Sequence, residues 1–118
     1  MGFTNVKVAV INPVTALERD VELLVDTGAV LSSVPRKVLE ALGIKPIGRR
    51  RLRVYGGQVI EREAAVVVIR YEKVRAGATV LFAEEEDTPV LGATALEALG
   101  YQVDPTTRQL KPTELLMI

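Results

Sequence analysis

The junction between a strand-like segment and an acidic turn constrains the fold of this chain more than any other feature of the sequence. Residues 19–25 are rich in Val and Leu, which favour β-strands, and they run without a linker into Asp26-Thr27-Gly28. Asp and Gly both favour tight turns, because an Asp side chain can bond to the backbone and Gly tolerates positive φ angles. The sequence therefore predicts a strand that ends in a turn whose first residue is a carboxylic acid.

Alternating and apolar segments predict further strands on both sides of this junction. Val alternates with Lys or Ala over residues 6–10 before Asn12-Pro13 breaks the pattern, which predicts a strand over 3–11. Gly56-Gly57, with alternating residues before it and Val59-Ile60 after it, is typical of a two-residue hairpin. The other predicted strands are 64–71, 78–83, 89–92, 101–104 and 109–110. The first of these five is apolar enough that we expect it to be buried on both faces.

Two segments have the spacing of short helices. Pro35 suits a first helical position, and apolar residues recur at helical spacing over 38–42 until Gly43 ends the pattern. A second such pattern covers 95–99 and stops at Gly100. With no linker-like or low-complexity stretch, the chain is expected to form a single, mainly β domain over residues 1–118 with one or two short helices.

Composition excludes several classes of function. The 118 residues contain no Cys and no His, which excludes Cys and His nucleophiles, His-dependent serine triads, Cys/His zinc sites and thiol redox chemistry. Carboxylate, lysine or hydroxyl chemistry remains, and we expect no metal and no cofactor. The 15 basic and 15 acidic side chains give no net charge, so nucleic acid is not an expected partner.

Membrane and secretion signals are not expected either. The first ten residues show no apolar core followed by a small-residue cleavage site, which favours a cytoplasmic location. The longest apolar run, residues 64–69, is six residues long, whereas a membrane helix needs roughly 20.

Three segments together resemble the retropepsin-like aspartic proteases. They are Leu-Leu-Val-Asp-Thr-Gly-Ala at 23–29, the Gly56-Gly57 hairpin, and Val-Leu-Gly-Ala at 90–93, in that order and at that spacing. The ending from Leu99 to Pro105 is similar to single-domain members found outside viruses, and the resemblance spans about residues 5–111. It implies a closed β-barrel, a mobile flap, and a dimer in which each chain gives one catalytic Asp.

Carboxylate chemistry agrees with this resemblance. Hydrolysis by carboxylates alone needs one ionised acid to deprotonate water and one protonated acid to polarise the carbonyl. Two carboxylates about 3 Å apart cannot both ionise, so they share a proton, as in aspartic proteases generally. The chain carries one Asp-Thr-Gly, and 118 residues cannot hold two pepsin-like lobes, so the second Asp is expected from a second subunit.

The resemblance also assigns roles to individual residues. Asp26 is expected to act as general base and, in the second subunit, as general acid. Thr27 would bond across the two-fold axis, Gly28 would let the backbone approach the substrate, and Ala29 continues the motif. The flap tip would be formed by Tyr55, Gly56 and Gly57 and would admit an extended peptide. Val90, Leu91 and Gly92 would pack beneath the catalytic loop.

Alternative interpretations remain open at this stage. The Asp-Thr-Gly segment could be an ordinary turn, and the glycine pair an ordinary hairpin. The chain would then be an inactive dimer of this fold that binds peptides or protein partners without cutting them. Leu31 and Ala93 stand where retroviral members usually carry an acidic residue and an Arg, which argues against a viral enzyme.

Three charged or apolar segments lie outside these motifs. Lys45 and the arginines at 49–51 and 53 form a cluster that we interpret as a solvated strand face, the alternative being RNA contact. The acidic run 84–87 is expected to be a solvated loop, or to offset those arginines across a dimer. The apolar tail 115–118 favours an interface.

Overall fold

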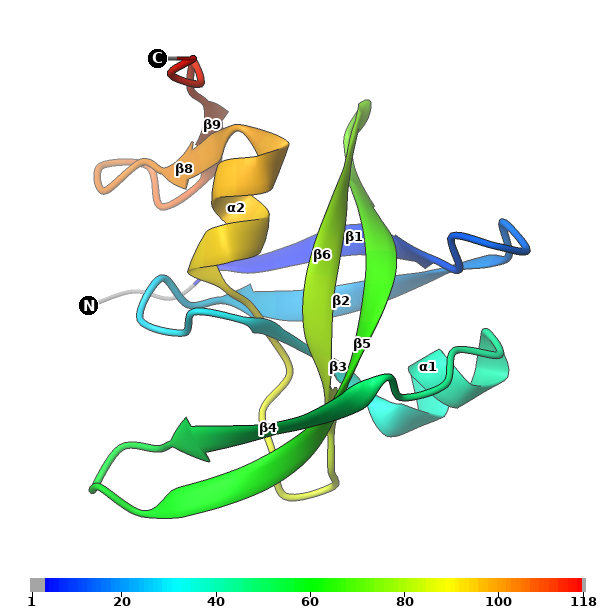
Figure 1. Cartoon of the computed structure of the whole chain (residues 1–118). Helices are drawn as coiled ribbons and strands as arrows, with labels where there is room; N and C mark the ends of the chain where they lie inside the picture. Colours follow the sequence, from blue (N-terminus) through cyan, green and yellow to red (C-terminus); the bar gives the residue numbers. More distant parts are fainter. Residues whose placement is uncertain (1–3, 118) are drawn as a thin grey trace.

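The strands of this protein close on themselves to form a ring around one core. In the computed structural model, which describes residues 4–117, seven strands form a sheet in the order β1-β2-β7-β3-β6-β5-β4. A further pairing of β1 with β5 closes the ring and leaves β4 outside it (Figure 1). The strands are β1 (Asn5–Ile11), β2 (Glu18–Val25), β3 (Ser32–Pro35), β4 (Gly48–Arg53), β5 (Val59–Tyr71), β6 (Val74–Ala83), β7 (Val90–Leu91), β8 (Tyr101–Val103) and β9 (Leu110–Pro112). The helices are α1 (Arg36–Ala41) and α2 (Ala93–Leu99).

The prediction of a mainly β fold with short helices is confirmed. The strand expected over 3–11 begins at Asn5, because Thr4 is not part of it, and residue 3 lies outside the described part of the chain. It pairs antiparallel with β2 from Asn5↔Leu24 to Ile11↔Glu18, and its last three residues also pair with β5. Neither helix within residues 4–117 has the length and apolar character that a membrane span requires.

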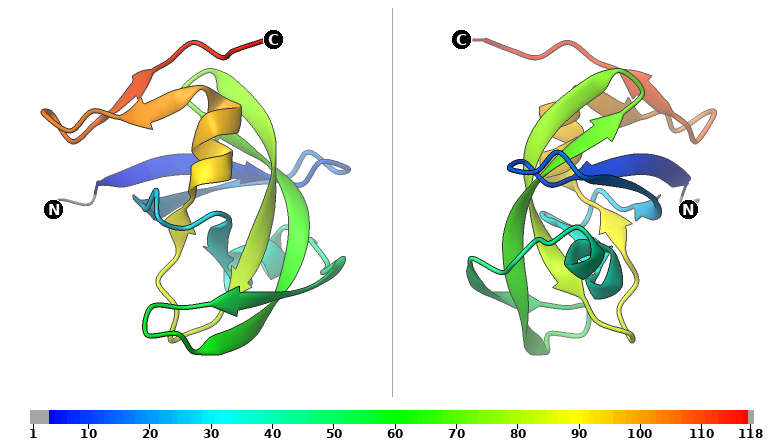
Figure 2. Two further views of the ribbon diagram at one scale, coloured as in Figure 1. Left: turned by 60° about the vertical axis from the view of Figure 1, so that its left-hand side comes forward. Right: turned by 90° about the vertical axis from the view of Figure 1, so that its right-hand side faces the viewer.

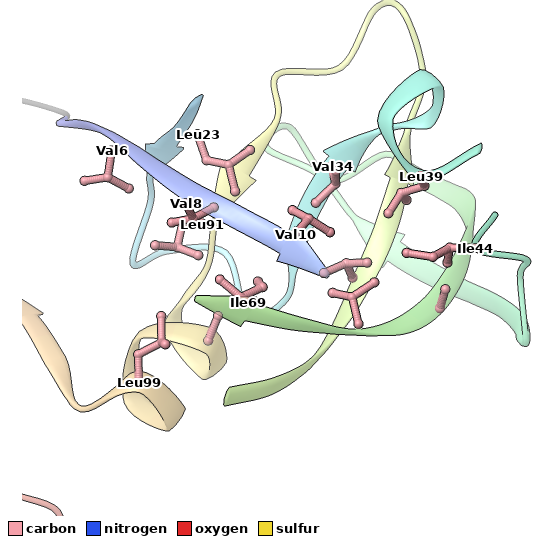
Figure 3. Close-up of a cluster of buried hydrophobic side chains, with 14 of the residues drawn as sticks. Val6, Val8, Val10, Leu23, Val34, Leu39, Ile44, Ile69, Leu91 and Leu99 are labelled. Atoms are coloured by element: carbon pink, nitrogen blue, oxygen red, sulfur yellow. The ribbon is translucent and has the colours of Figure 1, made fainter. Parts of the chain in front are cut away.

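The core fills the inside of the ring. Val6, Val8 and Val10 are buried whereas Lys7 between them is exposed, so the alternation in the sequence marks the inner face of β1. Apolar side chains from the other strands and both helices meet them there, including Leu23, Val34, Leu39, Ile69, Leu91 and Leu99 (Figure 3). Burying each such side chain fully stabilises the fold by about 1.5–3 kcal/mol.

Strand β3 is an element that sequence reasoning missed. Two serines begin this four-residue strand, which hides the apolar signal of a strand, yet Ser32 and Val34 are both fully buried. Pro35 ends β3 with an extended ψ of 135° and caps α1, so it is not the first helical residue as predicted. The first residue of α1 is Arg36.

Strand β5 corrects two expectations. It is one continuous strand of 13 residues, so the segments 59–60 and 64–71 are not separate strands. Its first part pairs with β4 in a hairpin and its second part belongs to the ring. Val66 points away from the core and is 46% exposed, so the expectation of burial on both faces is wrong.

The C-terminal part of the chain packs on one end of the ring. Gly100 ends α2 in the left-handed region at φ 77°, as its place after 95–99 predicted. β8 and β9 then form a separate two-stranded sheet, and the rings of Tyr71 and Tyr101 meet edge to face with centroids 4.9 Å apart. Leu115, Leu116 and Met117 of the apolar tail are exposed, and Ile118 lies outside the described residues.

Candidate active site

Asp26 lies directly after β2, in a turn that bonds to its own first residue. The amide of Gly28 donates to the Asp26 carboxylate at Oδ1 over 2.9 Å, and the amide of Ala29 donates to the Asp26 carbonyl over 3.1 Å. The Asp26 side chain is thereby oriented while Thr27 and Gly28 stay exposed. The turn therefore presents an oriented, half-buried carboxylate at the end of a ring strand.

A floor of residues from β7 lies beneath this turn. β7 pairs parallel with the end of β2, Leu24 with Val90 and Val25 with Leu91, and the Leu91 carbonyl accepts the Asp26 amide over 3.0 Å. Leu91 itself is fully buried. The structure thus brings residues 26–29 and 90–92 together, although they are far apart in the sequence.

Gly92 is where the two segments approach most closely. A Cβ atom at this position would lie 2.7 Å from both the carbonyl carbon and oxygen of Leu31 and 2.9 Å from the carbonyl oxygen of Ala29. The next amide, of Ala93, donates to the same Ala29 carbonyl over 2.8 Å, and Thr94 bonds to the Val30 carbonyl through both its amide and its hydroxyl. Only glycine fits here without displacing the Asp26 turn.

Ser32 is a supporting residue that sequence reasoning missed. Its hydroxyl oxygen accepts the Gly92 amide over 2.9 Å inside the core, and the neighbouring Ser33 hydroxyl accepts the Val90 amide over 3.1 Å. The only signal in the sequence is a Ser pair shortly after the acidic turn. That signal shows neither that Ser32 is buried nor that its partner is Gly92.

The predicted flap residues lie at the tip of the β4–β5 hairpin, which extends away from the ring (Figure 2). Residues 54–58 connect the two strands, and the Val54 amide donates to the Gln58 carbonyl over 2.9 Å, so three residues lie within this bonded pair where a two-residue turn was predicted. Gly56 and Gly57 have φ angles of 97° and 89°, which side-chain-bearing residues rarely adopt. Tyr55 is fully exposed at this tip.

A pocket of about 320 Å³ lies between the hairpin and the loop that joins β6 to β7. Its apolar lining includes Leu52, Val54 and Ile60 of the hairpin, and Arg62 and Asp87 line it as well. A larger hollow of about 680 Å³ beside α1 is lined by no residue of the hairpin, and Asp26 lines neither pocket. The smaller pocket therefore adjoins the two strands of the hairpin, while the predicted tip residues and the Asp26 turn lie outside its lining.

Ion pairs change the interpretation of the acidic run 84–87. The Arg62 guanidinium donates to both Asp87 carboxylate oxygens at 2.7 and 2.8 Å, and Arg36 donates to Glu84 over 2.8 Å. These hydrogen bonds lower the pKa of the Asp87 and Glu84 carboxyls below their ordinary values. The run is thus not simply a solvated loop: within one chain its arginine partners are Arg36 and Arg62, and a contact with the 49–53 cluster across a dimer stays a prediction.

That arginine cluster lies on β4 and faces solvent. Arg49 pairs with Glu61 over 3.2 Å, and the arginines at 50, 51 and 53 are exposed. Lys45 is exposed as well. Within residues 4–117 there is no group of three or more acidic side chains that could hold a metal ion.

Comparisons with known proteins agree with this geometry. A family model described as aspartyl protease matches residues 6–95, a segment that contains Asp26, the hairpin tip and Gly92. The solution structure of Simian Foamy Virus (mac) protease is similar in fold, with a TM-score of 0.55 at 16% sequence identity. That likeness covers 79% of this chain and 91% of the viral one. A search of curated proteins finds no match.

Proposed function

The chain belongs to the aspartyl protease family, and on that premise we propose that it is an aspartic endopeptidase whose active form is a homodimer. In this proposal each subunit supplies one Asp26. The observation that carries it is the single Asp-Thr-Gly turn of the chain, held at the end of β2 by the hydrogen bond from the Asp26 amide to Leu91.

The need for a second subunit follows from the chemistry of the reaction. Water activation and carbonyl polarisation require an ionised and a protonated carboxyl group together. Within the described residues, the one hydrogen-bond partner of the Asp26 side chain is the Gly28 amide, which bonds Oδ1. Asp26 Oδ2 is then left to share a proton with the Asp26 of a second copy across a two-fold axis.

The proposed reaction proceeds without a covalent intermediate. The ionised Asp26 takes a proton from a water molecule as the water oxygen attacks the peptide carbonyl carbon, and the protonated Asp26 donates its hydrogen to the carbonyl oxygen. The tetrahedral intermediate then collapses: the C–N bond breaks, the leaving nitrogen takes the proton that the first Asp26 accepted from water, and a hydroxyl of the intermediate gives its proton to the other Asp26 as the product carboxyl group forms. Each subunit's Thr27, exposed beside Asp26, is proposed to bond to the facing turn and fix the pair.

Substrate binding is assigned to the hairpin and the pocket beneath it. We expect an extended peptide to lie between the Asp26 turns and the two hairpins, which act as flaps. The 320 Å³ pocket would take a substrate side chain, and its lining by Leu52, Val54 and Ile60 favours an apolar one. Gly56 and Gly57 allow the tip to change its backbone angles when the substrate enters.

Cleavage of a diverse peptide library between about pH 3 and about pH 7 tests the proposal. Wild type is compared with Asp26→Asn at a protein concentration that gives a dimer by sedimentation. Asparagine keeps an oxygen to accept the Gly28 amide, so the turn is retained while the acid is lost. Asp20→Asn, an exposed position on β2, the strand that leads to Asp26, is the matched control.

The outcomes separate two functions. Cleavage by wild type and Asp20→Asn with none by Asp26→Asn supports the endopeptidase. Cleavage that survives Asp26→Asn contradicts it. A verified dimer that binds peptides without cutting them would instead be a binding protein of the same fold.

A further inference from the structure

The hairpin proposed as the flap is tied to the rest of the site by two arginines. Arg62 and Arg36 reach the loop of residues 84–89, which joins β6 to β7. We call this set of five side chains the two-arginine clamp: Arg36, Arg62, Glu63, Glu84 and Asp87. Two of its members, Arg62 and Glu63, belong to β5, the second strand of the hairpin.

The first half of the clamp is a bidentate pair. Arg62 Nε donates to Asp87 Oδ2 over 2.7 Å and Arg62 Nη2 donates to Asp87 Oδ1 over 2.8 Å. The two side chains are only 17% and 23% exposed, so solvent and salt screen this pair less than a surface pair. Asp87 Oδ2 also accepts the Glu84 amide over 2.8 Å, which fixes the loop on itself.

The second half of the clamp centres on Arg36 at the start of α1. Arg36 Nη2 donates to Glu63 over 2.6 Å and to Glu84 over 2.8 Å, and Arg36 Nε donates to the other Glu84 oxygen over 3.2 Å. The guanidinium lies 4.7 Å from the ring centroid of Phe82, which is fully buried. Arg36 therefore bridges the flap strand and the loop while resting on the core.

The two halves of the clamp start from consecutive residues of β5, Arg62 and Glu63. Arg62 and Glu63 are neighbours in a strand, so their side chains point to opposite faces of the sheet. Each nevertheless connects to the loop 84–87, Arg62 directly and Glu63 through Arg36. The loop is thus held to the flap strand from both faces, which restrains rotation as well as separation.

The clamp lies between the two parts that a substrate would touch. Arg62 and Asp87 line the pocket beneath the hairpin, and the clamped loop continues into β7, whose Leu91 carbonyl holds the Asp26 amide. A change in the clamp would therefore alter the spacing between the hairpin and the floor of the catalytic turn.

We infer that Arg36 and Arg62 are positioning residues, which hold the β4–β5 hairpin over the pocket through Glu63, Glu84 and Asp87. Neither arginine contacts the Asp26 turn in the described hydrogen bonds, so their effect passes through the hairpin and the loop. The inference rests on the proposed function where it concerns substrate. Its structural half, the restraint on the hairpin, can be tested without any catalysis.

Hydrogen exchange of the hairpin amides is the test of that structural half. Arg62→Gln and Arg36→Gln are compared with wild type and with Arg70→Gln. Arg70 lies on the same strand and forms an equivalent bidentate pair with Glu18, at 2.9 and 2.7 Å, away from the pocket. We expect exchange at residues 52–60 to rise about fivefold in both clamp variants and to stay unchanged in Arg70→Gln. Arg62→Lys keeps the charge and should restore part of the protection.

Peptide binding and turnover test the other half. Loosening the hairpin should raise KM about fivefold while kcat changes little. Binding of a peptide to the clamp variants in an Asp26→Asn background should weaken by a similar factor.

Three outcomes would overturn the inference. They are unchanged hydrogen exchange of the hairpin in the clamp variants, an equal rise of exchange in Arg70→Gln, and a fall in kcat at constant KM. If wild type does not cleave but exchange and peptide binding change as expected, the proposed function fails and the clamp stands. Where a glutamine variant does not fold, Asp87→Asn replaces Arg62→Gln and Glu84→Gln replaces Arg36→Gln, because each removes the acidic partner of that arginine.

Discussion

The backbone amide of Asp26 donates a 3.0 Å hydrogen bond to the backbone carbonyl of Leu91. This bond extends the parallel pairing of β2 with β7 by one residue, so the position of the acidic turn is set by the sheet and not by the turn alone.

Substituting Gly92 tests how closely the catalytic turn and its floor are packed. In Gly92→Ala the new methyl group would lie 2.7 Å from the Leu31 carbonyl, so backbone must shift. We expect a loss of about 1–3 kcal/mol in urea unfolding together with reduced peptidase activity. Gly77→Ala is the control, because a Cβ there meets nothing within 4 Å and should change stability by about 0.5 kcal/mol or less.

Ser32 is expected to stabilise the fold by accepting the hydrogen bond of the Gly92 amide. Ser32→Ala leaves the Gly92 amide without its 2.9 Å acceptor inside the core, which costs about 1–3 kcal/mol by thermal or urea unfolding. Ser33→Ala removes a longer bond of 3.1 Å at a less buried position and should cost less. A larger loss in Ser33→Ala would contradict this ranking.

The clamp predicts a particular pH dependence of stability. Hydrogen bonds from Arg62 and Arg36 lower the pKa of Asp87 and Glu84 in the folded state. Their contribution to stability is therefore fully present above the unfolded-state values of about 4, and it is lost as pH falls through the lower folded-state values. The melting temperature should decline below about pH 4 in wild type and less steeply in Asp87→Asn. An identical profile in the two proteins would contradict the assignment.

Substitution of Tyr55 distinguishes a role of the hairpin in substrate binding from a role in stability. Its side chain is fully exposed at the hairpin tip, so Tyr55→Ala should change the unfolding free energy by about 0.5 kcal/mol or less. If the hairpin covers the substrate, the same variant should lower kcat/KM for peptides. Val14→Ala, 90% exposed in the β1–β2 connection, is the control and should leave kcat/KM unchanged. Equal kcat/KM in Tyr55→Ala and wild type would argue against the flap role.

Mixing experiments test whether Asp26 is shared between subunits. An excess of Asp26→Asn incubated with wild type should form mixed dimers with one catalytic acid, so peptidase activity falls as the exchange of subunits proceeds. The same mixture assayed at once, before subunits exchange, is the control and should retain activity. Activity that stays constant after long incubation would show that one chain is sufficient.

Sequence alone predicted the elements whose signals are local. Val6, Val8 and Val10 mark one face of a strand by their spacing, and Gly100 ends a helix because it can adopt a left-handed φ angle. These features need no information about distant residues. The family resemblance added the order of the Asp-Thr-Gly turn, the glycine hairpin and the Val-Leu-Gly segment, and the match over residues 6–95 confirms the family.

The missed features depend on partners far along the chain. Ser32 is buried because the Gly92 amide bonds to it, and a Ser-Ser pair does not signal a strand on its own. Arg62 and Glu63 interrupt the apolar pattern of β5, yet the strand continues through them since each carries an ion pair. A polar pair such as Arg62 and Glu63 resembles the end of a strand in the sequence. In the structure the strand continues, and these side chains form ion pairs with residues far along the chain.

The arginines of β4 place positive charges along an open edge of the sheet. β4 stands at the end of the strand order, so within the described residues one of its edges has no strand beside it. An open edge can pair with the edge of another molecule, and a row of like charges opposes such growth. Arg49, Arg50, Arg51 and Arg53 supply that row on a strand of six residues. Copies of the same strand therefore repel one another, which disfavours edge-to-edge pairing of two molecules, whereas an uncharged or acidic extended chain would meet no such repulsion at this edge.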